Sequence, residues 1–306
     1  MRSELRFQRF AGVLLMAASL GCCAGAWAWG PATHAYVVLR MTDEAHPPQF
    51  LYEGEFLMSG CASPTEGNEK RFALLDAVFG AMHVDFSSPG AFPVPASRKL
   101  NAMTHFEFER LAASAFAWGF ATHNGAWGAD HYAHDYLRAA DSGTYLAGKI
   151  GELSAECGIT RTMAEDVLEM AVDFVIAIAH GPALGRLVMD SARIAGPRNE
   201  QALVDAFAEP LVERVPGLTR ERAELHIRWA ARIHRGLLES YGIQLIQGEG
   251  HVRRFAPPLL AQYMKCDTAE ARTVLFRAMD LCADYEPAMA RIAAALREKM
   301  DGMNGK

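Results

Sequence analysis

The chain has 306 residues, of which 51% are hydrophobic, with 30 Lys and Arg against 36 Asp and Glu. This length and apolar content suffice for one large core or two smaller ones and exclude an intrinsically disordered protein. The formal net charge of −6 argues against a dedicated nucleic-acid-binding surface, because neutralising phosphates requires a surplus of Lys and Arg.

The first 28 residues have the pattern of a secretory signal peptide. A start with three arginines precedes a run without charge from residue 11 to residue 28, which ends in the small residues Ala26 and Ala28. Cleavage after Ala28 removes three arginines and one glutamate, so the net charge falls from −6 to −8. We therefore expect a periplasmic or secreted protein whose mature chain begins at Trp29.

A second interpretation of the leader stays open. The segment Ser19-Leu20-Gly21-Cys22 loosely resembles a lipoprotein signal, in which the cysteine is lipidated. Processing at Cys22 would leave Trp29 inside the chain instead of at its start.

Four cysteines follow the predicted leader: Cys61, Cys157, Cys266 and Cys282. None of them has the Cys-x-x-Cys spacing of zinc or redox sites, and export would place them where disulfides persist. We expect them to be structural. Four cysteines allow three pairings, and the sequence does not choose among them.

Helical patterns dominate the chain after the leader, and the expected fold class is all-α. Good helix formers are abundant, apolar residues recur three and four positions apart, and strand-like alternation is scarce. The predicted helices cover residues 112–118, 162–179, 201–212, 220–241 and 269–300. No run after the leader is long and apolar enough to predict a membrane span.

Capping residues and glycines mark the expected helix ends. The predicted N-terminal caps are Thr162, Thr219 and Asp267, and the predicted stops are Gly242, Gly248 and Gly250. Residues 42–100 are the least regular segment, because they contain several proline and Ser-Pro turns. Loops in this segment could carry site residues.

The uneven distribution of 11 histidines indicates a metal site. Eight of them lie in the first two thirds of the chain, and these include seven near several carboxylates: His34, His83, His105, His123, His131, His134 and His180. Imidazole and carboxylate together are the ligands that zinc prefers. His226, His234 and His251 lie among Arg and Glu residues and are expected at the surface.

His123, Asp130 and His134 could form one stripe of ligands. On a continuous helix, offsets of seven and eleven residues fall within about 20° of the starting residue. His131 turns away from this stripe. Alternatively, Asn124-Gly125 is a turn that ends one helix at His123 and lets Asp130 begin another.

Glu169, Asp173 and His180 could form a second stripe on the next strong helix, at offsets of four and eleven residues. Two such stripes that face each other inside a helical bundle would form a buried metal-binding site.

The predicted mature N-terminus, Trp29-Gly30-Pro31-Ala32-Thr33-His34, resembles that of the zinc-dependent phospholipase C family. Related families are the single-strand-specific zinc nucleases and the N-terminal domain of GPI-specific phospholipase D. Three further segments are similar to ligand-bearing segments of the family in the same order: residues 80–86, residues 104–106 and residues 117–123. The resemblance covers roughly residues 29–180.

This resemblance implies an all-helical, exported enzyme that holds two to three Zn²⁺ ions per chain. The implied ligands are the freed amino group and carbonyl of Trp29, with His34, Asp85, His105, His123, Asp130 and His134. The family's histidine–glutamate pair for a third ion is missing, because residue 184 is leucine. We therefore assign Glu169, Asp173 and His180 to that ion on helical geometry.

The spacing of the ligands departs from the family pattern. His123 and Asp130 are seven residues apart, where the family has four, although seven residues roughly keep the helix face. His131 and Asp135 have the family's spacing of four residues and are the second pair of candidate ligands to be tested.

The implied function is an exported zinc-dependent phosphodiesterase of phospholipase C type, which hydrolyses a phospholipid head-group phosphodiester with metal-activated water. Asp85 and Asp130 are the expected catalytic residues, Asp130 as a bridge between two ions and Asp85 as the group that orients the water. Four nearby aromatic residues could line an apolar groove and allow peripheral membrane contact: Phe106, Trp118, Trp127 and Tyr132.

Two alternatives stay open: a single-strand nuclease or 3′-nucleotidase on the same scaffold, and a metal-binding scaffold protein without turnover. The expected organisation is a leader (1–28), a phospholipase C-like helical domain (29–190) and a helical extension (191–306) packed on the same core. The sequence makes no prediction of the oligomeric state.

Overall fold

The structure is a computed structural model that describes residues 29–42, 66–82, 94–112, 114–134 and 145–304. These residues form twelve α-helices and one 3₁₀ helix without any strand, so the prediction of an all-α fold is confirmed. The predicted leader lies outside them. In chain order the elements are α2 (Pro31–Met41), α4 (Glu66–Ala81), α5 (Val94–Phe106), η1 (Phe108–Arg110), α6 (Ala115–His123), α7 (Ala129–His134), α8 (Ala147–Cys157), α9 (Arg161–Ile194), α10 (Pro197–Arg214), α11 (Arg220–Ile246), α12 (Glu249–Met264), α13 (Thr268–Leu281) and α14 (Tyr285–Asn304).

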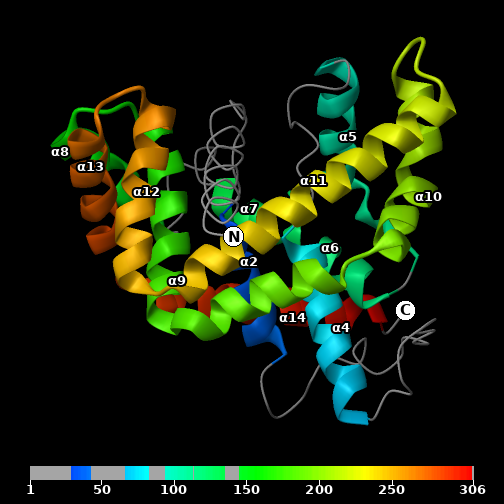
Figure 1. The fold of residues 1–306 in the computed structure, drawn as a ribbon, viewed down its shortest axis with the longest axis horizontal. Coiled ribbons are helices and arrows are strands. Elements are labelled where there is room, and N and C mark those ends of the chain that lie inside the picture. The colour runs from blue at the N-terminus through cyan, green and yellow to red at the C-terminus, as the bar shows by residue number, and fades with distance from the viewer. Residues whose placement is uncertain (1–28, 43–65, 83–93, 113, 135–144, 305–306) are drawn as a thin grey trace, which may run out of the picture.

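Helix α9 is the central element of the core. It packs against α2, α4, α8, α11, α12 and α13, and its side chains Leu168, Val172 and Ile176 are fully buried. Helices α8, α12 and α13 gather at one end of the molecule and α5 and α10 at the other, while α11 runs between the two ends (Figure 1). One hydrophobic cluster extends from Trp29 to Met300 and therefore includes residues on both sides of position 191.

The length and hydropathy of α9 differ from the sequence expectation, because this helix is long and apolar enough to cross a membrane. Of its most apolar window, 56% is buried inside the protein. A core helix passes the same test of length and composition, and α9 occupies that position in the fold.

Helix α9 is kinked at Gly181, which has φ 57° and ψ −147°. Pro182 follows and cannot donate a backbone hydrogen bond to the preceding turn, so the regular ladder is interrupted here. The direction of α9 changes at this point (Figure 1), which lets its second half follow α11.

Two glycines let α9 and α11 cross in backbone contact. A Cβ atom on Gly185 would lie 2.7 Å from the Ile246 nitrogen, and one on Gly242 would lie 2.6 Å from the Met189 nitrogen. The prediction that Gly242 ends a helix is therefore wrong, because the residue serves a helix crossing inside α11.

The other predicted helix ends are partly confirmed. Thr219 caps α11 by accepting from the Arg222 amide, and Asp267 caps α13 by accepting from the Glu270 amide. Helix α9 is capped by Thr160 and not by Thr162, which lies inside its first turn. Among the remaining glycines, Gly248 separates α11 from α12, whereas Gly250 lies within α12.

The segment expected to be least regular, residues 42–100, contains α4 and the beginning of α5 where it is described. Three of the cysteines also have described positions, and Cys157, Cys266 and Cys282 are all free thiols. No disulfide therefore joins these three cysteines, and Cys61 lies outside the described residues. Cys282 is buried, and this burial raises the pKa of its thiol to about 12.

His226 is buried rather than at the surface. Its side chain is 1% exposed on α11, and its Nε2 atom lies 3.2 Å from the Ser97 hydroxyl of α5. The surrounding Arg and Glu residues of α11 occupy other faces of the same helix. Burial lowers the pKa of His226 to about 4.

We expect the contribution of His226 to the free energy of unfolding to fall by up to about 3 kcal/mol as the pH decreases from 6.5 to 4, whereas the raised pKa of Asp173 acts in the opposite direction in wild type and variant alike. The folded-state pKa of His226 lies below that of the unfolded chain, so the unfolded chain binds more protons in this window. The contribution of the neutral ring is complete above pH 6.5 and is lost as the pH falls. Urea unfolding of metal-free protein at several pH values measures it.

The matched variant is His226→Gln, which keeps a hydrogen-bonding group beside Ser97 but does not titrate. Relative to this variant, the wild type should lose unfolding free energy as the pH falls across the same window. An identical pH dependence in the variant would show that His226 is not the responsible group.

Candidate metal centre

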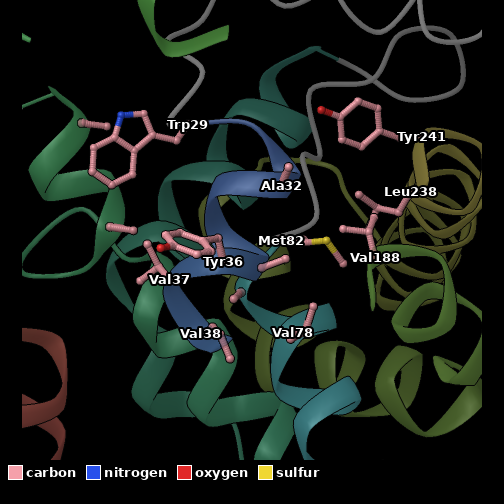
Figure 2. Packing of buried hydrophobic residues seen from close by; sticks show 14 of the residues in the cluster. Trp29, Ala32, Tyr36, Val37, Val38, Val78, Met82, Val188, Leu238 and Tyr241 are labelled. Carbon is pink, nitrogen blue, oxygen red and sulfur yellow. The ribbon is translucent and has the colours of Figure 1, made fainter. Parts of the chain in front are cut away.

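The first turn of α2 begins directly at the predicted mature N-terminus. Gly30 is the N-cap residue, and Pro31 occupies the first helical position, where its missing N–H is not needed. Trp29 is 2% exposed and packs beside this turn (Figure 2). The predicted chain start is therefore built into the core.

Three predicted ligands come together from three separate helices. The rings of His34 on α2 and His123 on α6 are stacked, with centroids 4.4 Å apart. The ring of His105, in the last turn of α5, meets His123 edge-on at 5.2 Å between centroids. In the histidine cluster (His34, His105 and His123), His34 is 2% exposed and His123 is 7% exposed, whereas His105 is partly exposed.

The orientation of His123 is fixed by the end of α4. Its Nδ1 atom lies 3.1 Å from the carbonyl oxygen of Ala81, an acceptor, so Nδ1 carries the proton and donates. Histidines that bind metals usually hold their second nitrogen in this way, which orients Nε2 for coordination. Gly119 permits the close approach of α4 and α6, because a Cβ atom there would overlap the Ala77 carbonyl.

The predicted continuous stripe of His123, Asp130 and His134 is wrong as a single helix. Helix α6 ends at His123, and the side-chain oxygen of Asn124 accepts from the amides of Ala126 and Trp127 at 2.9 and 3.0 Å. This turn separates α6 from α7, and the alternative based on Asn124-Gly125 is confirmed.

Several predicted site residues lie outside the described part of the structure. Asp130 and His134 belong to the short helix α7, but their side chains are not described, and neither are Asp85 and Asp135. The assignment of Asp85 and Asp130 as catalytic residues therefore stays a prediction.

Asp173 contacts the first turn of α2 and is 3% exposed. Its Oδ1 atom accepts from the Thr33 amide at 2.7 Å and from the Thr33 hydroxyl at 3.0 Å, and Oδ2 accepts from the Tyr241 hydroxyl. Burial raises the pKa of Asp173 to about 6, and these hydrogen bonds act in the opposite direction.

Glu169 lies one turn before Asp173 and is 1% exposed. Glu165, one turn earlier, is 4% exposed and was not predicted from the sequence, although its spacing of four from Glu169 is visible there. Tyr241 was also missed, because nothing in the sequence indicates that α11 reaches Asp173. The face of α9 that carries Glu165, Glu169 and Asp173 is therefore buried in the protein.

His180 does not share the surroundings of Asp173. Its Nε2 atom lies 3.1 Å from the Tyr285 hydroxyl, and its ring packs on Tyr36 at 4.4 Å between centroids. Burial lowers its pKa. His180 directly precedes the kink in α9, and these contacts join it to α2 and α14.

The aromatic residues predicted near the site have different environments. Phe106, beside His105, is 58% exposed. Trp127 packs edge-on against Phe108 with ring centroids 5.4 Å apart, and both Trp118 and Tyr132 are partly buried against the core. Phe106 is therefore the aromatic side chain available for contacts outside the protein.

The described residues contain no group of three or more His, Cys, Asp or Glu side chains placed to hold a metal ion. Asp85 and the side chains of Asp130 and His134 lie outside the described residues. The donors that are described, three imidazoles with one ring oriented through Ala81, are of the chemical type that binds zinc, but they are not by themselves placed to hold an ion.

Comparison with known proteins adds no relative. No protein-family model matches the chain, and no match was found among curated proteins or among solved structures. The resemblance to the phospholipase C family therefore depends on the segments of the sequence that carry it.

Proposed function

We propose that this protein is an exported zinc-dependent phosphodiesterase of phospholipase C type. The observation that carries the proposal is the meeting of His34, His105 and His123, which lie up to 89 positions apart in the sequence. All three are ligands that the family resemblance of the sequence predicts. Unrelated surface histidines would have no reason to converge inside the protein.

The proposed zinc ligands are the histidine cluster and, from the family resemblance, Trp29, Asp85, Asp130 and His134. Zinc bound by such residues supplies a Lewis acid and lowers the pKa of a bound water toward neutrality. Ala81 holds His123 in the tautomer that presents Nε2. Glu169 remains a candidate ligand, whereas His180 is engaged with Tyr285 and Tyr36.

The substrate class follows from the charge and from Phe106. A negatively charged protein can bind an anionic phosphodiester only where local positive charge is concentrated, and a zinc cluster provides that concentration. Phe106 follows His105 in the chain and is exposed, and we assign it to the contact with an acyl chain of the substrate. This placement favours a phospholipid over a nucleotide and agrees with a peripheral contact with a membrane.

Hydrolysis assays of the zinc-loaded protein test this proposal. We expect release of a phosphorylated head group from phosphatidylcholine vesicles and loss of this activity when zinc is chelated. Release of acid-soluble nucleotides from single-stranded DNA instead would identify the nuclease alternative. Bound zinc without hydrolysis of either substrate or of a chromogenic phosphodiester would identify the scaffold alternative and contradict an enzymatic function.

A further inference from the structure

We propose that Asp173 and Tyr241 form a clamp on the first turn of α2 that positions Trp29 and His34, and that Asp173 is a positioning residue and not a metal ligand. The inference rests on the proposed function only in naming a metal centre as the site that the clamp serves. It changes the assignment of Asp173, which the helical spacing grouped with Glu169 and His180.

The hydrogen bonds of Asp173 already occupy its carboxylate. Oδ1 accepts from the amide and the hydroxyl of Thr33, and the carboxylate also accepts from the Ala32 amide. Oδ2 accepts from the Tyr241 hydroxyl. A helix start leaves its first amides without partners inside the helix, and a carboxylate placed there satisfies them and interacts favourably with the helix dipole.

The clamp also touches the backbone before the helix. A Cβ atom on Gly30 would lie 2.5 Å from Oδ2 and 2.7 Å from Oδ1 of Asp173, so only glycine allows the carboxylate to sit this close. Tyr241 approaches α2 from the side opposite Trp29, and its hydroxyl points toward the first turn (Figure 2). The segment from Gly30 to Thr33 is thereby held between α9 and α11.

This segment connects the two candidate ligands of α2. Trp29 directly precedes Gly30, and His34 directly follows Thr33. Since Asp173 is hydrogen-bonded to Thr33 and packs closely on Gly30, a shift of the first turn would move Trp29 and His34 together. Outer residues that orient metal ligands typically contribute 10–100-fold to metal affinity.

The structure offers a matched control in a second tyrosine that donates to an aspartate of α9. Tyr263 of α12 donates its hydroxyl to Asp166 of α9, so Tyr263→Phe removes the same type of hydrogen bond without touching α2. The test variant is Tyr241→Phe, which keeps the packing of the ring, and Asp173→Ala is the stronger variant. Circular dichroism establishes that each variant is folded.

The first readout is hydrogen exchange of residues 29–36 in the metal-free proteins, followed by mass spectrometry. We expect faster exchange in this segment for Tyr241→Phe and Asp173→Ala, and wild-type exchange for Tyr263→Phe. Unchanged exchange in folded Tyr241→Phe would overturn the clamp. If Asp173→Ala does not fold, Tyr241→Phe alone decides.

The second readout is zinc affinity, measured by competition with a chelator, together with the visible spectrum of the Co²⁺-substituted proteins. We expect Tyr241→Phe to bind zinc roughly 10–100-fold more weakly and to change the Co²⁺ spectrum. Equal affinity and an identical spectrum would overturn the positioning role. A wild-type protein that binds no zinc, but whose exchange responds to Tyr241→Phe, would contradict the proposed function and leave the clamp intact.

Discussion

Replacing Gly242 with alanine is expected to lower the free energy of unfolding by about 3 kcal/mol. The new Cβ atom would lie 2.6 Å from the Met189 nitrogen and 2.7 Å from the Gly185 oxygen. Both are backbone atoms of α9, so no side-chain rotation can relieve the overlap. Helices α9 and α11 would have to separate along the main contact of the core, and overpacking of this kind typically costs about 1–3 kcal/mol. Urea unfolding measures the effect.

Gly236→Ala is the matched control because Gly236 lies on the same helix, with nothing within 4 Å of the position of a Cβ atom. Alanine is the better helix former, so this variant should be more stable than wild type by about 0.5–1 kcal/mol. Opposite signs for the two variants are the expected result. Equal stabilisation by both would mean that the α9–α11 crossing is wider than the structure has it.

Replacing His123 with glutamine is expected to weaken zinc binding by more than about 100-fold, because outer residues of a metal site already contribute 10–100-fold. His123 is the member of the histidine cluster that contacts both other rings. Its loss therefore removes one nitrogen ligand and the ring that separates His34 from His105. Zinc affinity and hydrolysis of the chromogenic phosphodiester are the two measurements.

His251→Gln provides the comparison for this variant. His251 lies on α12, where its Nε2 atom is 2.5 Å from the side-chain oxygen of Gln244, and it has no predicted part in the site. Its zinc affinity and activity should equal those of wild type. If His123→Gln binds zinc as tightly as His251→Gln does, the histidine cluster is not a metal site.

The sequence predicts the class of the fold well, because helix-forming composition and apolar periodicity are local properties. It also predicts the caps Thr219 and Asp267, which act within one turn of their own helices. It fails where a residue serves a distant partner. Gly242 has the composition of a helix stop but faces Met189 of another helix, and only the tertiary structure reveals that contact.

In the candidate site, too, spacing within one helix is visible in the sequence, whereas contacts between helices are not. The convergence of His34, His105 and His123 was predicted from the family resemblance and could not come from spacing, since the residues lie on three helices. Spacing alone suggested that His123 continues into Asp130, and the two amides bound by Asn124 break that helix. Asp173 was found by spacing, but its partner Tyr241 lies 68 residues away and has no sequence signal.

Within the proposed function, removal of the predicted leader would create a zinc ligand at Trp29, which is buried just before α2. Its α-amino group exists as a ligand only when the chain begins there, and a group with a pKa near 7.7–8.0 can lose its proton to zinc at neutral pH. A chain with extra residues before Trp29 would lack this ligand. Such a chain is expected to bind less zinc and to have lower activity than the chain that begins at Trp29.

The zinc content of the protein beginning at Trp29 tests the central claim most directly. Elemental analysis after dialysis should give two to three zinc ions per chain, and the chain extended before Trp29 should retain fewer. Protein that begins at Trp29, is folded and holds no zinc after exposure to it would contradict the claim.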